Sequence, residues 1–146
     1  MTVGDNGTIL TSSDGTTWTE RTSGISRGLS GVTYGNGTFV TVGYTVSTST
    51  TTTTTSTDNS SSDNSTTTST TTTEKSTTTL TSSDGVTWTL RDSGTSNELR
   101  GSITYGNGLF VTVGWEGTIL TSSDGISWDN RTSGTTNNLY GVTYKE

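Results

Sequence analysis

The chain repeats a short pattern of residues about every 40 positions, and this periodicity limits what it can fold into. The block Thr-Ser-Ser-Asp-Gly occurs at 11–15, 81–85 and 121–125, and each copy has a Trp three residues after its Gly. A second block, Thr-Tyr-Gly-Asn-Gly, occurs at 33–37 and 104–108 and continues, after one residue, into Phe-Val-Thr-Val-Gly. Repeats of this length indicate one supersecondary unit stacked on copies of itself.

Within one period, short alternating runs separated by turn residues predict four strands. Taken from their clearest copies, these strands cover 29–34, 38–43, 118–121 and 127–131. Asn36-Gly37 accepts positive φ at both turn positions and predicts a hairpin between the first two strands. No segment of ten or more residues carries a helical apolar stripe, so we expect essentially no helix. Four strands per repeat are typical of a propeller blade, and the predicted fold is an all-β propeller of three four-stranded blades.

The Ser-Ser-Asp-Gly-x-x-Trp block resembles the Asp-box of the bacterial neuraminidase (BNR) repeats, found in β-propeller proteins of bacteria and phages. The resemblance covers nearly everything except residues 45–77, and it departs from the family in that Asp and Gly are adjacent here. It implies a fold-stabilising turn between the third and fourth strands of a blade, remote from any active site. The residues of the three turns are Ser12, Asp14, Gly15, Trp18, Ser82, Asp84, Gly85, Trp88, Ser122, Asp124, Gly125 and Trp128. Such a motif points to a fold and says little about function.

The order of the strands along the chain predicts how the blades are completed. Residues 1–4 match the second-strand residues 111–114, and residues 141–144 match a first strand. These two terminal strands are complementary, so we expect them to complete one blade and thereby hide the sheet edges. Three blades are fewer than the four or more of a normal ring. We therefore expect a dimer or a filament, the alternative being a fragment or a distorted three-blade ring.

Residues 45–77 form a Ser/Thr-rich insertion between the second and third strands of the middle blade. Turn-forming residues at its centre and β-branched residues on both sides favour a long two-stranded arm. The alternative is a disordered, O-glycosylated loop. The central stretch 58–64 lacks the spacing and terminal acidic ligand of a calcium loop, so we expect no metal site.

Composition narrows the possible functions. The chain has no His and no Cys, which removes the commonest general base, the commonest metal ligand and any disulfide framework. Its formal charge of −6 argues against a nucleic-acid partner. No apolar run is long enough for a membrane span, and no signal-peptide pattern is present. We therefore expect a protein that is not an enzyme, has no cofactor and does not insert into membranes.

Loops joining the second strand to the third, and the fourth to the next first strand, would share one face of a propeller. Variable polar and aromatic loops on a rigid scaffold are where binding usually occurs. Trp115 stands out because the repeat does not require Trp there, whereas the repeated tryptophans are expected to pack between blades. The candidate ligand face comprises Arg27, Tyr44, Asn97, Trp115, Glu116, Asn137 and Asn138. The alternative is that these loops are merely solvated.

Further sequence features suggest modification and a location. Candidate N-glycosylation sequons begin at Asn6, Asn59, Asn64 and Asn130. We predict an extracellular, cell-surface or virion location and a non-catalytic role in binding and self-assembly. The expected partner is the protein itself, with a glycan or a surface protein as a further possibility. One alternative is a carbohydrate-binding lectin using the face around Trp115. A remote alternative is a sialidase-like glycosidase, although Arg21, Arg91 and Arg131 occur once per repeat and do not suggest a single convergent site.

Overall fold

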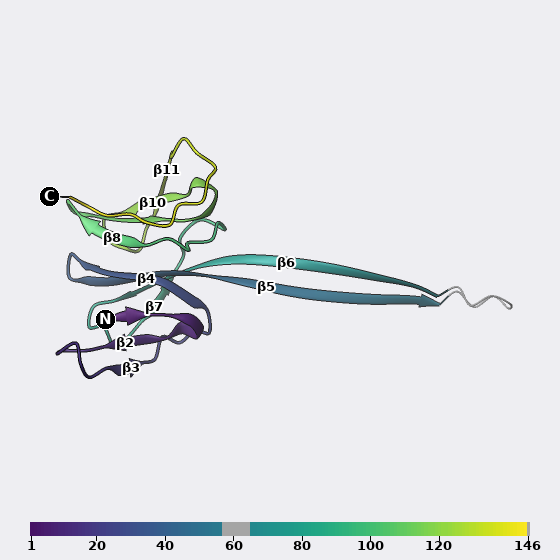
Figure 1. Ribbon diagram of the computed structural model, residues 1–146, viewed down its shortest axis with the longest axis horizontal. Coiled ribbons are helices and arrows are strands. Elements are labelled where there is room, and N and C mark those ends of the chain that lie inside the picture. Colours follow the sequence, from purple (N-terminus) through teal and green to yellow (C-terminus); the bar gives the residue numbers. More distant parts are fainter. Residues whose placement is uncertain (57–64, 146) are drawn as a thin grey trace.

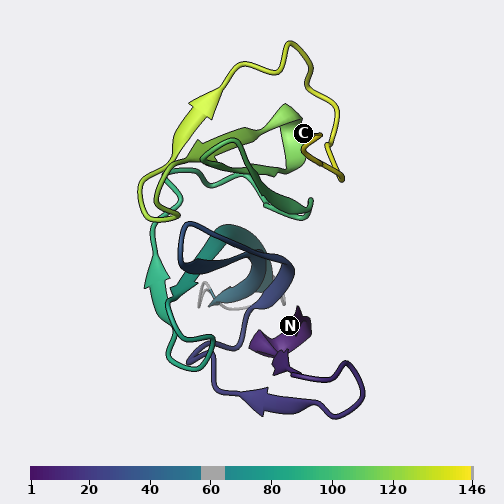
Figure 2. The same ribbon diagram turned by 90° about the vertical axis from the view of Figure 1, so that its left-hand side faces the viewer.

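The computed structural model describes residues 1–56 and 65–145 and contains three antiparallel sheets, stacked along an arc (Figures 1 and 2). The first sheet contains β1 (Thr2–Val3), β2 (Ile9–Thr11) and β3 (Thr19–Arg21). The second contains β4 (Gly28–Gly35), β5 (Thr38–Ser56), β6 (Ser65–Ser82) and β7 (Thr89–Arg91). The third contains β8 (Ile103–Gly106), β9 (Leu109–Val113), β10 (Ile119–Ser122) and β11 (Asp129–Arg131).

The all-β prediction is confirmed. Within each sheet the strands follow one another in chain order, so every sheet is an antiparallel meander. The predicted hairpins form at Asn36 and Asn107, whose φ angles of 47° and 49° place them in the left-handed region that Asn tolerates. The only helical elements in the described residues are two 3-10 turns, η1 (Asp5–Gly7) and η2 (Trp115–Gly117), and none could span a membrane.

The expected closure of the chain on itself does not occur. The first sheet has three strands, and β1 pairs only with β2. Segment 139–144, which we expected to pair with β1, lies at the other end of the arc beside β8, and the second sheet separates the two (Figure 2). Ser102 N–H donates to the Tyr140 carbonyl at 3.0 Å, and Leu139 N–H donates to the Gly114 carbonyl at 2.9 Å. These bonds hold the segment against the third sheet without making it a strand.

Two apolar cores lie between consecutive sheets. Between the first and second sheets, Ile9, Leu29 and Leu80 are buried, and Trp88 packs against them. The core between the second and third sheets is larger. Its buried residues are Val40, Val42, Leu99, Ile103, Phe110 and Leu120, with Tyr105 and Trp128 packed against them. Because each alternating strand places one set of side chains on one face, sheet-on-sheet packing buries that face.

The Thr-rich insertion extends β5 and β6 into a long two-stranded ribbon that projects from the stacked sheets (Figure 1). The two strands pair without a bulge from Phe39↔Ser82 to Ser56↔Ser65. Facing hydroxyls add contacts along the ribbon, as between Thr50 and Thr71, whose Oγ1 atoms are 3.5 Å apart. Threonine favours this pleated geometry because its branched side chain fits the strand surface. Residues 57–64, including the stretch considered for calcium, lie outside the described residues.

We expect the three sheets to fold without the arm. Replacing residues 45–77 by Glu-Gly, as found in the equivalent turn at 116–117, restores the short link used by the third sheet. The arm contributes little to either apolar core, so the shortened chain should keep a cooperative thermal transition and a strand-type circular dichroism spectrum. A non-cooperative transition would show that the arm is part of the folding unit.

Candidate functional site

The three Ser-Ser-Asp-Gly blocks form turns that satisfy their own backbone. Asp84 Oδ1 accepts hydrogen bonds from the backbone N–H groups of Val86 and Thr87, both at 2.8 Å. Ser82 Oγ donates to the same carboxylate at 2.9 Å and accepts the N–H of Gly85 at 2.8 Å. Equivalent bonds surround Asp14 and Asp124. All twelve residues singled out in the sequence therefore lie in or beside the turns that join β2 to β3, β6 to β7 and β10 to β11.

These backbone donors change the acidity of the turn carboxylates. Hydrogen bonds from Thr87 N–H, then Val86 N–H, then the Ser82 hydroxyl lower the pKa of Asp84 from 3.8 to about 2. The pKa of Asp14 is lowered in the same way to about 2, chiefly by Thr17 N–H. Because the hydrogen bonds favour the ionised form, each carboxylate helps to hold its turn together while it is charged.

Stability should therefore decline as these carboxylates take up protons. With a pKa near 2 in the folded chain and 3.8 as the ordinary value, Asp84 contributes its full share above about pH 4 and loses it as the pH falls toward 2. Asp84→Asn keeps the oxygen acceptor but cannot titrate, so its melting temperature should fall less over this range than that of the parent chain. Asp84→Ala should melt lower than the parent at neutral pH, because two backbone donors lose their acceptor.

Thermal melts from pH 7 to pH 2 measure both effects. Asp129→Asn is the matched control, since this exposed side chain pairs with Arg131 and caps no turn. Equal melting temperatures for the parent and Asp84→Ala at pH 7 would contradict a stabilising role for the carboxylate.

At the opposite end of the strands, five side chains meet at the base of the arm, two from β5 and β6 and three from the loop before β8 and from η2. We call Tyr44, Lys75, Glu98, Arg100 and Trp115 the arm-base cluster. The Arg100 guanidinium carbon lies 3.8 Å from the centre of the Tyr44 ring and 4.6 Å from that of Trp115. Lys75 Nζ lies 5.2 Å from the Trp115 ring centre. The two aromatic side chains predicted for the ligand face are thus both engaged by cations.

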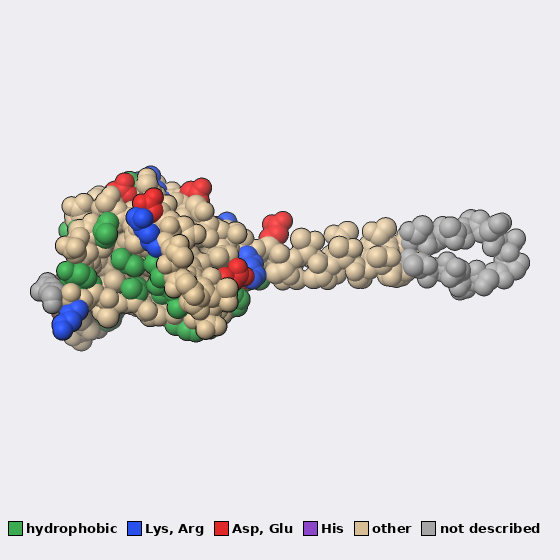
Figure 3. Space-filling view, turned by 90° about the horizontal axis from the view of Figure 1, so that it is seen from above, with side chains coloured by type: hydrophobic (Ala, Val, Ile, Leu, Met, Phe, Trp, Pro, Cys, Tyr) green, Lys and Arg blue, Asp and Glu red, His purple; other side chains and the backbone are tan. Residues whose placement is uncertain are grey.

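Glu98 is the buried charge at the centre of the arm-base cluster. Its side chain is only 2% exposed, and it forms ion pairs with Arg100 and, at 3.7 Å, with Lys75. Burying a carboxylate is costly unless it is paired, so the two cations offset the loss of hydration. Since Lys75 belongs to β6 and Glu98 precedes the third sheet, the pair ties the base of the arm to the neighbouring sheet. Figure 3 shows charged side chains gathered at this junction.

The remaining residues of the predicted ligand face form separate contacts. Arg27 Nη1 donates to Ser76 Oγ at 3.0 Å, on the arm strand β6. Asn97 Nδ2 donates to Thr118 Oγ1 at 2.9 Å, and Asn138 Oδ1 accepts the N–H of Glu116 at 3.1 Å. Asn137 N–H donates to Thr135 Oγ1 at 3.1 Å. Asn97 and Asn138 therefore each join two loops, whereas Arg27 bonds to a strand and Asn137 bonds within its own loop.

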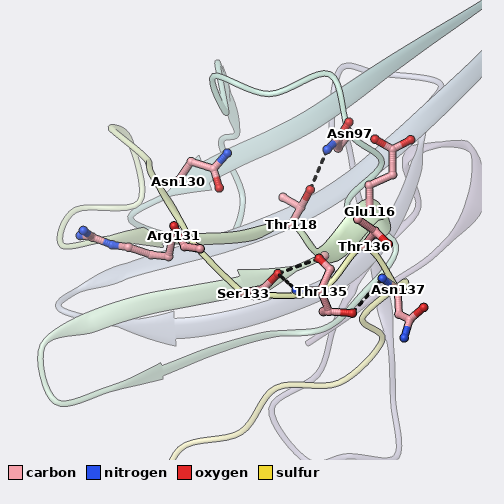
Figure 4. A pocket seen from close by; sticks show the side chains of 12 residues that line it. Asn97, Glu116, Thr118, Asn130, Arg131, Ser133, Thr135, Thr136 and Asn137 are labelled. Atoms are coloured by element: carbon pink, nitrogen blue, oxygen red, sulfur yellow. Dashed lines mark hydrogen bonds between the residues drawn. The ribbon is translucent and has the colours of Figure 1, made fainter.

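Asn97, Glu116 and Asn137 also line an open polar cavity of about 760 Å³ beside the loop 130–137 (Figure 4). A cavity of about 640 Å³ occupies the same position in the first sheet, between residues 6–7 and 20–26. Because it recurs at equivalent positions, the cavity is a product of the repeat and does not single out one ligand site. Neither cavity is lined by an aromatic ring.

The candidate glycosylation residues differ in how far the structure describes them. Asn6 and Asn130 are exposed, the first in η1 with a φ of 55° and the second on β11. Asn59 and Asn64 lie outside the described residues. Glycosylation at these sequons remains a prediction.

The three repeated arginines do not converge. Arg21 Nε and Arg91 Nε each donate to a threonine hydroxyl ten residues earlier at 2.9 Å, and Arg131 Nε does so at 2.8 Å. Each arginine is therefore bonded within its own sheet, on the outermost strand.

Comparison of the chain with protein-family models, with curated proteins and with solved structures gives no match.

Removing Arg100 should destabilise the chain by about 1–3 kcal/mol, because buried Glu98 would then keep only Lys75 as a partner. Arg100→Met preserves much of the apolar stem, and urea denaturation measures the change. Lys75→Met is the matched control and should cost less, since Lys75 is more exposed and more distant. Glu98→Gln combined with Arg100→Met should recover part of the loss. An Arg100→Met variant as stable as the parent would contradict this account of the arm-base cluster.

Proposed function

We propose that this protein is a non-catalytic module of the propeller type, which assembles with copies of itself and thereby presents its loops and arms. The observation that carries the proposal is the position of segment 139–144. Leu139 N–H donates to the Gly114 carbonyl just as Leu29 N–H, in β4, donates to the Gly4 carbonyl at 3.0 Å. The segment thus stands against the third sheet as the innermost strand of a further sheet would.

The three other strands that such a sheet would need have counterparts at the opposite end of the chain. Strands β1, β2 and β3 form a sheet whose β1 edge has no partner among the described residues. An unpaired edge is a template for strand addition through main-chain hydrogen bonds, which require no special side chains. A second copy can therefore supply to segment 139–144 the three strands it lacks.

The two alternatives considered from the sequence have less support in the geometry. A lectin would use the face of Trp115 to stack on a sugar, but Arg100 and Lys75 lie over that ring. A sialidase-like glycosidase would need its arginines to converge on one carboxylate, whereas the three repeated arginines bond to separate threonines.

An extracellular, cell-surface or virion location is consistent with the arm. Its described side chains are nearly all hydroxyl-bearing and exposed, and Figure 3 shows them with few charges and little apolar surface. Such a ribbon contributes reach and polar contacts without an apolar core. We propose that arms carried on an assembled ring or filament are displayed in a fixed direction, because the arm-base cluster anchors each one.

Light scattering coupled to size-exclusion chromatography tests the proposal on the full chain. We expect a mass of at least two chains at micromolar concentration, and a chain lacking residues 139–146 should have the mass of one. The arm-replaced chain described above is the matched control, because it removes more residues but leaves both ends intact. A full chain that stays a single copy throughout the micromolar range would overturn the proposed function.

A further inference from the structure

The two sheet-to-sheet interfaces inside the chain follow one rule. In each, the Gly of a Ser-Ser-Asp-Gly turn lies against the preceding sheet, just before β1 in the first sheet and on β5 in the second. A Cβ added at Gly85 would meet Met1 at 3.0 Å, and one added at Gly125 would meet Val40 at 2.5 Å. Met1 and Val40 occupy the same position of the repeat. The repeat itself therefore specifies what covers each turn.

The first sheet lacks this cover. Gly15 is exposed and has nothing within 4 Å of an added Cβ, whereas Gly85 and Gly125 are buried. Trp18 is 44% exposed, whereas Trp88 and Trp128 pack against the two apolar cores. The outer face of the first sheet thus has the residues of an interface and no partner among the described residues.

On the third sheet, the face that a following sheet would cover is left partly exposed. Val111 is the counterpart of Val40, but it is half-buried, whereas Val40 is fully buried beneath the third sheet. Segment 139–144 lies beside β8 of the same sheet, and its Tyr140 is 67% exposed. The outer face of the third sheet therefore matches the face of the second sheet that the third one covers.

We propose that the first sheet of one copy docks head-to-tail on the third sheet of a second copy, with Gly15 and Trp18 covering the second copy's Val111. This inference rests on the proposed function and specifies its interface. The occupant is a second copy because the two unpartnered faces reproduce, position by position, the two halves of an interface that the chain already makes internally. A heterologous contact of this kind closes into a ring or continues as a filament.

The internal sheets also set the strand register across this interface. In the second sheet Val32 pairs with Thr41, and in the third sheet Ile103 pairs with Thr112. The same rule pairs Val142 of one copy with Thr2 of the other. Antiparallel partners lie about 4.5–5.5 Å apart at Cα, which is within the range that a disulfide spans.

Two tryptophan variants test the face contact. Trp18→Ser should weaken self-association at least tenfold, measured by sedimentation, and leave the melting temperature of the single copy unchanged. Trp128→Ser is the matched control: it removes a packing residue from the chain's own core and should lower the melting temperature. If Trp18→Ser associates as tightly as the parent, the proposed interface is wrong.

Cysteine pairing tests the register, and the chain contains no Cys that would interfere. A full chain carrying Thr2→Cys is mixed with one carrying Val142→Cys and mildly oxidised, and we expect the mixed disulfide as the main product. Thr89→Cys, on the exposed outer strand β7, replaces Val142→Cys in the control mixture and should give at most one tenth of that yield. A parent chain that assembles while the two mixtures react equally would overturn this interface alone. A parent chain that remains a single copy would overturn the proposed function as well.

Discussion

The fold depends on one constraint: a short antiparallel sheet with one apolar face must cover that face with another sheet. Both apolar cores lie between consecutive sheets, so each sheet buries its apolar face only against a neighbouring sheet. The same constraint explains why the repeated tryptophans differ in exposure. Trp88 and Trp128 have a preceding sheet to pack against, whereas Trp18 has none within the part of the chain that the structure describes. Packing of the first sheet against a second copy is the simplest way to cover its apolar face.

Local features were predictable from sequence because the repeat displays them more than once. The hairpins at Asn36 and Asn107, the carboxylate-capped turns and the all-β class each follow from short-range chemistry. Closure was not predictable in this way, because it depends on how far one sheet is rotated against the next. The sequence left open whether segment 139–144 would complete a sheet within one chain or with a second copy. Within one chain it does not pair with β1: it packs beside β8, and its backbone bonds go to Ser102 and Gly114.

The arm-base cluster was also missed, although a signal was present. Tyr44 and Trp115 were singled out, but as a ligand face, while Glu98 and Arg100 replace the small residues Gly28 and Ser30 of the preceding repeat. A buried acid and its cations at one interface, and not at the other, mark the point where the arm leaves. Pairing across sheets cannot be read from spacing within a repeat. Side chains at the base of the arm and in the neighbouring loop therefore anchor the arm, and those in the loop stand where the preceding repeat has small residues.

Amide hydrogen exchange tests the central claim, that the open ends of the chain cover one another, most directly. Backbone amides in β1 and in segment 139–144 should exchange several-fold more slowly at high protein concentration than at low, because an edge strand gains main-chain partners only in the assembly. Amides in the middle of the second sheet should exchange equally at both concentrations. Exchange in β1 and segment 139–144 that does not depend on concentration, in a chain that does assemble, would contradict the account.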